Sequence, residues 1–372
     1  MTEPAVASSQ IVKLAPPPAR SAPSVVRVDD DWYAVCRSFE LAKKPIAVTL
    51  LGAPLVVYRT QGGIGALLDR CAHRNVPLSL GKTTSDRIEC PYHGWQFGPD
   101  GECRHIPCLI GDTEARARKV PAYAARELDG HIFVYGRPDV VPLREPYRFP
   151  YYGDERYTKI HFAMDLPGSV HAVAENALDV PHTAFLHGGL FRKPGRDHPI
   201  DVVIRRDNDM CEAEYLGEPA PKGLIGRLLA PGGGEVQHTD RFRLPAVTEV
   251  EYRLGDDSHL VVASALCPRG DFETRLFAVA AFRLPWFLPA RLVGVVAQPI
   301  ARLILAQDRR MLRHQTGAIH RFGGEQLIST DVDVLGPHIL RLLKNAEAGR
   351  RDSGDEERGR DGPFERRVTM RV

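Results

Sequence analysis

The sequence predicts an α+β protein of two domains, with a small β-rich domain over residues 28–140 and a larger α+β domain over residues 141–345. Three observations support this prediction. The chain has 372 residues, which is long for one domain and natural for two. Residues 136–150 are proline-rich and are typical of a linker. Before the linker the chain has short β-rich runs, and after it helical and strand-like runs alternate.

The first domain is expected to consist of short strands and tight turns. Residues 46–60, "IAVTLLGAPLVVYRT", are two runs rich in β-branched residues around Gly-Ala-Pro, which predicts a hairpin. Residues 95–106, "WQFGPDGECRHI", hold a Gly-Pro-Asp-Gly turn between two short runs. Residues 130–136, "GHIFVYG", predict a short strand bounded by glycines.

The second domain combines helical and alternating patterns. Residues 168–187, "GSVHAVAENALDVPHTAFLH", are helix-like, and residues 292–316 predict a long helix. Three runs alternate like strands: "DVVIRRD", "TEVEYRL" and "HLVVASAL". A sheet with helices is therefore expected here.

The two ends of the chain are expected to lie outside both domains. Residues 1–27 are rich in Pro, Ala and Ser and lack the apolar core of a signal peptide, which indicates a disordered arm. Residues 346–372 are a run of mixed charge that predicts a solvated, disordered tail.

Composition limits the partners and the compartment. The formal net charge is +2, which gives no electrostatic reason to expect binding to nucleic acid or to an anionic membrane. Seven cysteines without a regular framework favour a reducing, cytoplasmic location over a disulfide scaffold. No run of eighteen apolar residues lacks charge, so no spanning helix is expected. Residues 282–306 are nevertheless very apolar, which favours a core segment, or alternatively an access surface for a hydrophobic substrate at the cytoplasmic face of a membrane.

Two cysteines and two histidines form the first candidate site. Cys71 and His73 stand in "CAHRNVPLSLG", and Cys90 and His93 stand in "CPYHGWQF". The alternatives are coincidence, a structural zinc site, and a two-iron, two-sulfide Rieske cluster held by two thiolates and two imidazoles. A Cys₂His₂ finger has both cysteines first, whereas here each segment supplies one cysteine and one histidine. This order favours the cluster, in which neutral imidazoles make the outer iron a better electron acceptor.

These segments resemble the Rieske domain of non-haem iron oxygenases, the ring-hydroxylating oxygenase α subunits and their monooxygenase relatives. "CAHR" through "CPYHGW" carries the resemblance, and Trp95 after His-Gly matches it. The resemblance implies an all-β Rieske domain followed by a catalytic domain with a central antiparallel sheet of the helix-grip, START-like kind.

Two later histidines form the second candidate site. His182 and His187 are five residues apart in "ENALDVPHTAFLH", so on a regular helix their rings would point about 140° apart. A shared metal therefore needs an irregular backbone, which Pro181 makes plausible. The candidate third ligand is Asp308, a carboxylate within the apolar stripe of a predicted helix. Two histidines and one carboxylate are the ligand set of oxygen-activating ferrous iron. The alternatives are scattered structural histidines and a salt bridge from Asp308 to a neighbouring arginine.

The family resemblance extends to these residues. "EN-x-x-D-x-x-H-x-x-x-x-H" resembles the catalytic signature of Rieske oxygenases, and "QD" with the apolar residues near it resembles their late carboxylate segment. The resemblance implies that His182, His187 and Asp308 bind a mononuclear Fe(II). It also implies that Asp179 bridges His182 and, across a subunit boundary, His93, and that Asn176 lies near the open face of the iron.

The resemblance implies an O₂-dependent oxygenase whose electrons come from other chains. No Gly-x-Gly-x-x-Gly stretch or second cysteine cluster is present, so flavin and NAD(P)H are expected on a separate reductase, with or without a ferredoxin. A homotrimer follows from the resemblance alone. The expected activity is hydroxylation, demethylation or desaturation of a hydrophobic substrate, such as a lipid, sterol or polycyclic compound. The alternatives are a Rieske electron carrier without oxygenase activity, a zinc-containing binding module, and a dioxygenase of small aromatics.

Overall fold

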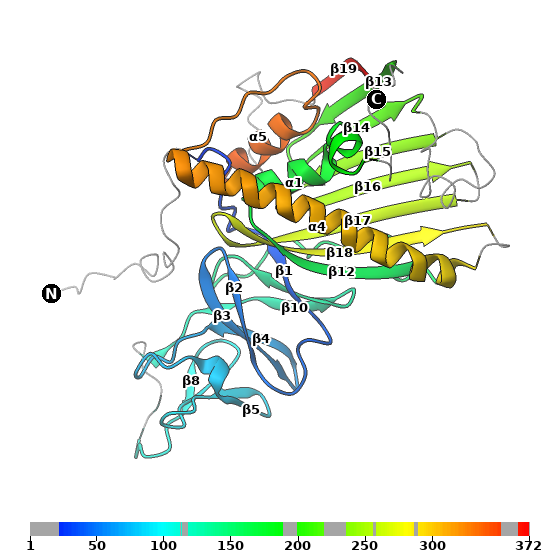
Figure 1. Ribbon diagram of the computed structural model, residues 1–372. Coiled ribbons are helices and arrows are strands. Elements are labelled where there is room, and N and C mark those ends of the chain that lie inside the picture. The colour runs from blue at the N-terminus through cyan, green and yellow to red at the C-terminus, as the bar shows by residue number, and fades with distance from the viewer. Residues whose placement is uncertain are drawn as a thin grey trace. The chain divides into compact units, whose positions relative to one another are not determined.

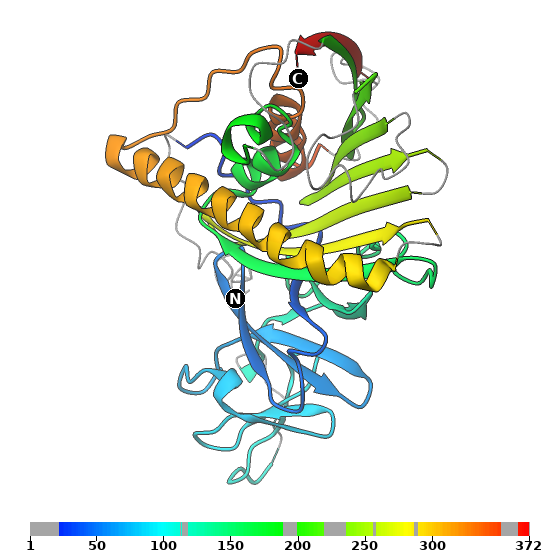
Figure 2. The same ribbon diagram turned by 45° about the vertical axis from the view of Figure 1, so that its right-hand side comes forward.

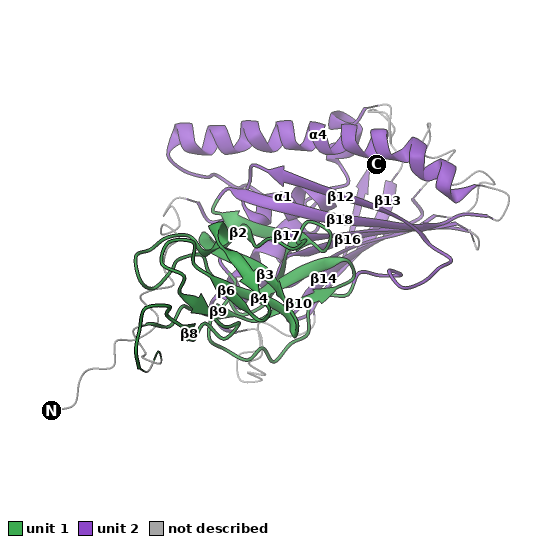
Figure 3. Ribbon diagram, turned by 90° about the horizontal axis from the view of Figure 1, so that it is seen from below, with its two compact units in different colours: residues 1–17, 28–148, 267–271 green, residues 18–27, 149–266, 272–372 purple. Residues whose placement is uncertain are grey.

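The structure is a computed structural model. The chain forms two compact units, which are coloured separately in Figure 3. Unit 1 contains residues 28–148 and 267–271, and unit 2 contains residues 149–266 and 272–372 together with a short N-terminal segment. The residues that the structure describes are 22–111, 113, 118–188, 199–218, 236–255, 258–285, 289–350 and 364–371.

Unit 1 is β-rich, as the sequence predicted, and is built from three small antiparallel sheets. The first contains, in spatial order, β1 (Trp32–Arg37), β11 (His131–Tyr135) and β10 (Ala125–Leu128). The second contains β2 (Ile46–Leu50), β3 (Ala53–Thr60), β4 (Gly63–Leu68) and β9 (Ala122–Tyr123). The third contains β5 (Lys82–Thr84), β6 (Arg87–Glu89), β7 (Gln96–Phe97) and β8 (Cys103–His105), and a short 3₁₀ turn, η2 (Leu78–Leu80), precedes it.

The predicted hairpin of residues 46–60 is confirmed, with its turn one step earlier than Gly-Ala-Pro. Leu51 and Gly52 join β2 to β3 with φ values of 52° and 82°. Two positive φ angles in a two-residue loop are the geometry whose twist matches that of paired strands, and glycine at the second position adopts it without strain.

Unit 2 contains one large antiparallel sheet, and its helices lie on one face of it (Figures 1 and 2). The strands in spatial order are β12 (Thr158–Leu166), β18 (Glu273–Arg283), β17 (Ser258–Gly270), β16 (Val247–Leu254), β15 (Val236–Arg243), β14 (Met210–Leu216), β13 (Pro199–Arg206) and β19 (Phe364–Arg371). The helices are α1 (Val170–Leu178), α2 (His182–Leu186), α4 (Ala290–Phe322) and α5 (Gly336–Glu347). The α+β class is confirmed, including the central antiparallel sheet.

The expectation that both chain ends are disordered is wrong for the parts that the structure describes. The last strand, β19, pairs with β13 from Pro199↔Arg371 to Arg206↔Phe364 and completes one edge of the sheet. Its charged residues find partners there, because Arg367 lies 2.7 Å from Asp201. At the other end, the backbone nitrogen of Ser24 donates to Glu325 at 2.8 Å. Charge alone predicted solvation, but an edge strand accommodates charged side chains. Residues 1–21, 351–363 and 372 of these segments lie outside the described residues.

The boundary between the units also differs from the expected one at residue 140. Unit 1 extends to residue 148 and takes residues 267–271 from the middle of the later domain. There the backbone nitrogen of Leu51 donates to the carbonyl of Pro268 at 2.6 Å. A contact between residues so far apart along the chain leaves no local signal in the sequence.

The apolar segment of residues 282–306 is not mainly a core segment. Most of it lies in α4, where side chains such as Leu292, Val295 and Leu303 are more than half exposed. By length and composition alone, α4 is also apolar enough to cross a membrane. One side of it nevertheless packs against the sheet, since Val293 and Ala297 cover a cluster that contains Ile160.

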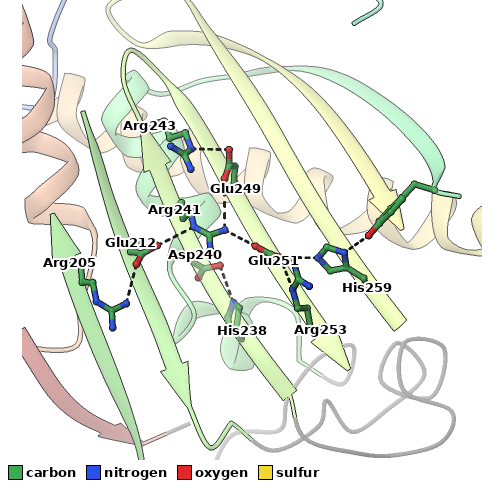
Figure 4. Close-up of polar contacts among 11 residues, drawn as sticks. Arg205, Glu212, His238, Asp240, Arg241, Arg243, Glu249, Glu251, Arg253 and His259 are labelled. Carbon is green, nitrogen blue, oxygen red and sulfur yellow. Dashed lines mark hydrogen bonds and ion pairs between the residues drawn. The ribbon is translucent and has the colours of Figure 1, made fainter. Parts of the chain in front are cut away.

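The face of the sheet opposite the helices carries a ladder of alternating charges (Figure 4). Arg205, Glu212, Arg241 and Glu249 stand opposite one another on four successive strands. Arg205 lies 3.0 Å from Glu212, and Glu212 lies 3.1 Å from Arg241. Opposite charges directly across a sheet stabilise the register of its strands.

Replacing Glu251 by glutamine is expected to lower the free energy of unfolding by about 2 kcal/mol at neutral pH, because Glu251 is mostly buried and its partners would lose their countercharge. Its side chain lies 2.9 Å from His259, 2.6 Å from Arg241 and 2.9 Å from Arg253. Hydrogen bonds from His259, with smaller contributions from the two arginines, hold the pKa of Glu251 well below its ordinary value of 4.5 despite burial.

A carboxylate with a depressed pKa stabilises the folded state above its unfolded pKa, and this contribution is lost as the pH falls below 4.5. Urea unfolding should therefore show a difference between wild type and Glu251→Gln at pH 7 that shrinks as the pH is lowered. The control is Glu365→Gln. Glu365 pairs with Arg205 at the end of the ladder, and its side chain is 68% accessible. Its replacement should change the free energy of unfolding by less than about 0.5 kcal/mol. Equal effects of the two variants would contradict the prediction.

Candidate metal centres and active site

The first group of predicted ligands lies in two loops of unit 1. Cys71 and His73 follow β4, and Cys90 and His93 lie between β6 and β7. Both cysteines are buried, with 1% and 2% of their surface accessible. The structure thus places all four residues in loops, as the prolines and glycines around them predicted.

The two loops fold back on their cysteines in the same way. The backbone nitrogen of Asn75 donates to the carbonyl of Cys71 at 3.0 Å, and that of Gly94 donates to Cys90 at 3.1 Å. Asn75 and Gly94 both have positive φ, 62° and 69°. At Gly94 a Cβ atom would also lie 2.9 Å from the ring of Pro107, so only glycine fits this turn.

The four side chains form one cysteine pair and one histidine pair. Cys71 and Cys90 are neighbours whose thiols influence each other, and the rings of His73 and His93 lie 4.6 Å apart. His73 stacks on Trp95 at 4.7 Å, and its Nδ1 atom is buried without a hydrogen-bond partner among the described residues. A buried nitrogen without a partner is costly unless a ligand binds it. This two-and-two arrangement fits a cluster whose two irons have different ligands.

The pKa values of Cys71 and His73 bear on how these two residues would bind iron. Burial and the neighbouring Cys90 raise the pKa of Cys71 to about 11. Burial, with the positive charges of His93 and Arg74, lowers the pKa of His73. The histidine is therefore ready to bind metal in its neutral form, whereas the thiol must release a proton when iron binds.

The second group of predicted ligands meets in unit 2. His182 Nε2 lies 3.3 Å from His187 Nε2, and Asp308 Oδ1 lies 3.6 Å and 3.1 Å from these two nitrogens. In the part of the chain that the structure describes, this is the group of three donors close enough to share one metal ion.

An interruption of the helix allows the two histidines to converge. α1 ends at Asp179, whose backbone is extended at φ −85° and ψ 104°. After Pro181 a separate helix, α2, has only five residues and ends at His187, which leaves the helical conformation. The 140° angle expected on a continuous helix therefore does not arise.

Asp308 is a buried carboxylate with an incomplete set of partners. Only 9% of its surface is accessible, and Oδ1 makes no hydrogen bond of acceptable geometry to a described residue although His187 is 3.1 Å away. Burial would raise the pKa of Asp308, but His182 and His187 hold it below its ordinary value. Burial likewise opposes the charge on His182, yet the nearby carboxylates of Asp179 and Asp308 raise the pKa of His182 to about 9. A divalent cation would take the place of the protons on the histidine Nε2 atoms that face Asp308. The three residues therefore fit a metal ion.

Two further groups orient the histidines. The Nδ1 atom of His187 donates to Oε1 of Gln307 at 2.7 Å. The Nδ1 atom of His182 donates to the backbone carbonyl of Asp179, whose carboxylate lies 3.6 Å away. Both Nε2 atoms are thereby left to face Asp308. The sequence analysis assigned Gln307 no role. The pair "QD" could have drawn attention to it, because Gln307 stands directly before the proposed ligand Asp308.

The three residues lie at a cavity of about 360 Å³ between the sheet and the helices of unit 2. Its walls are mainly apolar, with side chains such as Phe162, Val262, Leu276 and Ile304. Asn176 and Asp179 line it near the end of α1. Polar groups of the sheet, among them His238 and Asp240, also line it and were missed, because a strand alternating polar and apolar residues is an ordinary pattern.

Two family descriptions match the two parts of the chain. "Rieske [2Fe-2S] domain" matches residues 31–123, and "Vanillate O-demethylase oxygenase C-terminal domain" matches residues 168–349. The chain belongs to the Rieske non-haem iron oxygenases.

Relatives of this Rieske oxygenase are enzymes of the same family. The methylxanthine N1-demethylase of Pseudomonas putida is 29% identical over 260 residues, which are 67% of this chain and 72% of that protein. The oxygenase component of dicamba O-demethylase from Stenotrophomonas maltophilia is 32% identical over 206 residues, which are 54% of this chain and 60% of that one. The structure of dicamba monooxygenase bound to dicamba superimposes with a TM-score of 0.73 over 87% of this chain and 98% of that one, at 21% identity, and shows the fold.

Membership in the family decides between the alternatives for the two sites. A Rieske oxygenase carries a [2Fe–2S] cluster and a mononuclear iron, and it uses O₂. The match over residues 168–349 to an oxygenase domain favours an oxygenase over a simple Rieske electron carrier, and the match over residues 31–123 to a [2Fe–2S] domain favours the cluster over a zinc module.

Proposed function

We propose that this chain is the oxygenase component of a monooxygenase system that hydroxylates or demethylates an apolar organic substrate. The observation that carries the proposal is the convergence of His182, His187 and Asp308 on a mainly apolar cavity of about 360 Å³. Demethylation is supported by relatives whose names describe N- and O-demethylases. Electrons would come from a separate flavin reductase, with or without a ferredoxin.

We assign the ligands as follows. Cys71 and Cys90 would hold one iron of the cluster, and His73 and His93 the other. In unit 2, His182, His187 and Asp308 would hold the mononuclear iron. When bound, the cluster supplies single electrons and the mononuclear iron supplies the chemistry of O₂ activation.

The remaining residues would position the substrate and the ligands. The apolar walls would exclude water from the reacting substrate. Asn176 would face the open side of the metal site, and Gln307 would hold the His187 ring. Asp179 would orient His182 and connect it to His93 of a neighbouring subunit.

We also propose the assembly and location of the protein. Unit 1 would be the Rieske domain and unit 2 the catalytic domain, in a cytoplasmic homotrimer. Peripheral contact with a membrane is supported by the exposed apolar side chains Leu292, Val295, Val296 and Leu303 of α4.

Metal and sulfide analysis tests the proposed function. Protein purified and reconstituted without oxygen should contain about three irons and two acid-labile sulfides per chain. Two irons with two sulfides, and no metal in unit 2, would reduce the protein to an electron carrier. Zinc without sulfide would overturn the assignment of unit 1.

Replacing Asp179 by asparagine should leave iron and sulfide contents unchanged but lower substrate oxidation by about 10–100-fold, because the loss of a carboxylate that orients a metal-binding histidine typically costs that much activity. The decisive readout is a single turnover, in which the reduced cluster should no longer be oxidised in step with product formation. Glu155→Gln, at an exposed position of unit 2, is the control. Full activity of Asp179→Asn would remove Asp179 from the electron path.

A further inference from the structure

Two hydroxyl side chains stand opposite each other in the sheet wall of the cavity. Thr248 on β16 is the direct cross-strand neighbour of Ser264 on β17, and both residues line the cavity. Both are more than nine-tenths buried, with 1% and 5% of their surface accessible. Among the described residues, neither hydroxyl has a hydrogen-bond partner, and the two do not bond to each other. We call Thr248 and Ser264 the hydroxyl pair.

Strand geometry places the hydroxyl pair on the cavity side of the sheet. Side chains alternate between the two faces of a strand. Every second residue of β16 lines the cavity, from Thr248 through Val250 to Tyr252, and Val262 and Ser264 follow the same alternation on β17. Directly opposite residues of antiparallel strands have Cβ atoms about 4.5–5.5 Å apart, so one ligand atom can contact both hydroxyls.

Apolar side chains flank the hydroxyl pair on three strands. Phe242, opposite Thr248 on β15, is fully buried. Val250 and Val262, the next residues of β16 and β17 on this face, pair with each other. A hydroxyl buried in apolar surroundings without a hydrogen-bond partner is unfavourable.

The described part of the fold gives the hydroxyl pair no structural role. Buried hydroxyls are usually bonded to the backbone or to another side chain. The carboxylate of Asp240, on the strand next to Thr248, hydrogen-bonds His238 at 2.9 Å and neither hydroxyl. These two positions therefore point to a partner from outside the fold.

The chemistry of the hydroxyl pair selects a neutral acceptor. Each hydroxyl has one hydrogen to donate, and a carbonyl oxygen has two lone pairs, so a single carbonyl oxygen can accept from both. An N–H group of a ligand would use lone pairs of the hydroxyls but leave both hydrogens without an acceptor. A full charge costs far more to bury than a neutral polar group, and neutral hydroxyls do not compensate it.

We propose that the hydroxyl pair binds a carbonyl oxygen of the substrate, so that the cavity selects apolar compounds that carry a ketone, ester or amide carbonyl. This inference rests on the proposed function, because it takes the cavity as the substrate site. The hydroxyl pair fixes one polar atom of the substrate at the sheet, while the apolar walls hold the rest in the cavity that the predicted metal ligands also line.

Two probes of one shape test the proposal: acetophenone and α-methylstyrene, which carry a carbonyl oxygen and a methylene group at the same position. Their binding to anaerobic holoenzyme is measured by isothermal titration calorimetry, and the readout is the ratio of ketone affinity to alkene affinity. Thr248→Val and Ser264→Ala each remove one hydrogen bond and should lower this ratio by about fivefold. The double variant should lower it by at least about tenfold. A double variant with the wild-type ratio, or wild type that binds neither probe, would overturn the proposal.

Thr239→Val is the matched control. Thr239 stands between His238 and Asp240 on β15, so its side chain lies on the opposite face of the sheet, and the variant should keep the wild-type ratio. Thermal unfolding of ligand-free enzyme detects a purely structural role. Because the hydroxyl pair makes no hydrogen bond within the described fold, Thr248→Val and Ser264→Ala should leave the melting temperature unchanged. A lower melting temperature with an unchanged affinity ratio would assign the hydroxyls to the fold and reject the proposal.

The measurements separate this inference from the proposed function. Binding needs no turnover, so holoenzyme with its full iron content but no hydroxyl-dependent preference for the ketone would reject the inference alone. Protein without the mononuclear iron would instead reject the proposed function.

Discussion

Asp308→Asn is expected to lose one of three irons per chain and to lower substrate oxidation by more than about 100-fold. Changes to groups that only orient metal ligands already cost 10–100-fold, and Asp308 is itself a proposed ligand. An amide is a weaker ligand for iron than a carboxylate and carries no charge to offset the cation. Both sulfides and the cluster should be retained, because the proposed cluster ligands lie in unit 1.

Iron and sulfide are measured on anaerobic protein, and cluster absorbance is recorded on the same sample. Asp331→Asn is the matched control, since the Asp331 side chain is 72% accessible and pairs with Arg366. The control should keep three irons and full activity. Three irons in Asp308→Asn would show that the buried carboxylate is not a ligand.

Cys90→Ser is expected to give the complementary result, with both sulfides and two irons lost and the mononuclear iron kept. Thiolate is the soft ligand that iron–sulfur clusters require, and serine does not replace it. Reductase-supported substrate oxidation should fall by at least about 100-fold, because no electron reaches unit 2. Iron in unit 2 should persist, since its proposed ligands lie on α2 and α4.

Cys103→Ser is the matched control for the cluster. Cys103 is buried in the same unit, with 2% of its surface accessible, and its sulfur contacts only the carbonyl of His105 at 3.9 Å among the contacts described. The control should keep two sulfides and its visible absorbance. Loss of the cluster in both variants would point to general destabilisation of unit 1.

Short-range patterns pointed to most of the proposed donors of both centres. Cys71 and His73, like Cys90 and His93, are close neighbours in the chain, so one loop places each pair. The strands and turns around them also followed local rules of alternation and turn chemistry. These signals act within about ten residues, which is the range that single-sequence reasoning resolves.

Some errors of the sequence analysis came from treating charge and hydropathy as measures of exposure. The charged residues 364–371 predicted a tail, yet they form β19, because pairing with β13 satisfies their backbone. The apolar residues of α4 predicted a core segment, yet much of that helix surface is exposed. Composition indicates whether a segment is, on average, buried or exposed to solvent. Where β19 and α4 lie is decided by the open edge of the sheet and by the packing of α4.

By itself, the sequence determined the family and the α+β class and supplied the candidate metal ligands, because these depend mainly on residue types at short spacings. Tertiary structure alone decided that Asp308 meets His182 and His187, that Gln307 holds the His187 ring, and that His238 lies between two carboxylates at the cavity. The physical reason is that these contacts join segments separated by up to 126 residues, from His182 to Asp308, and only the packing of α4 and the sheet brings such segments together.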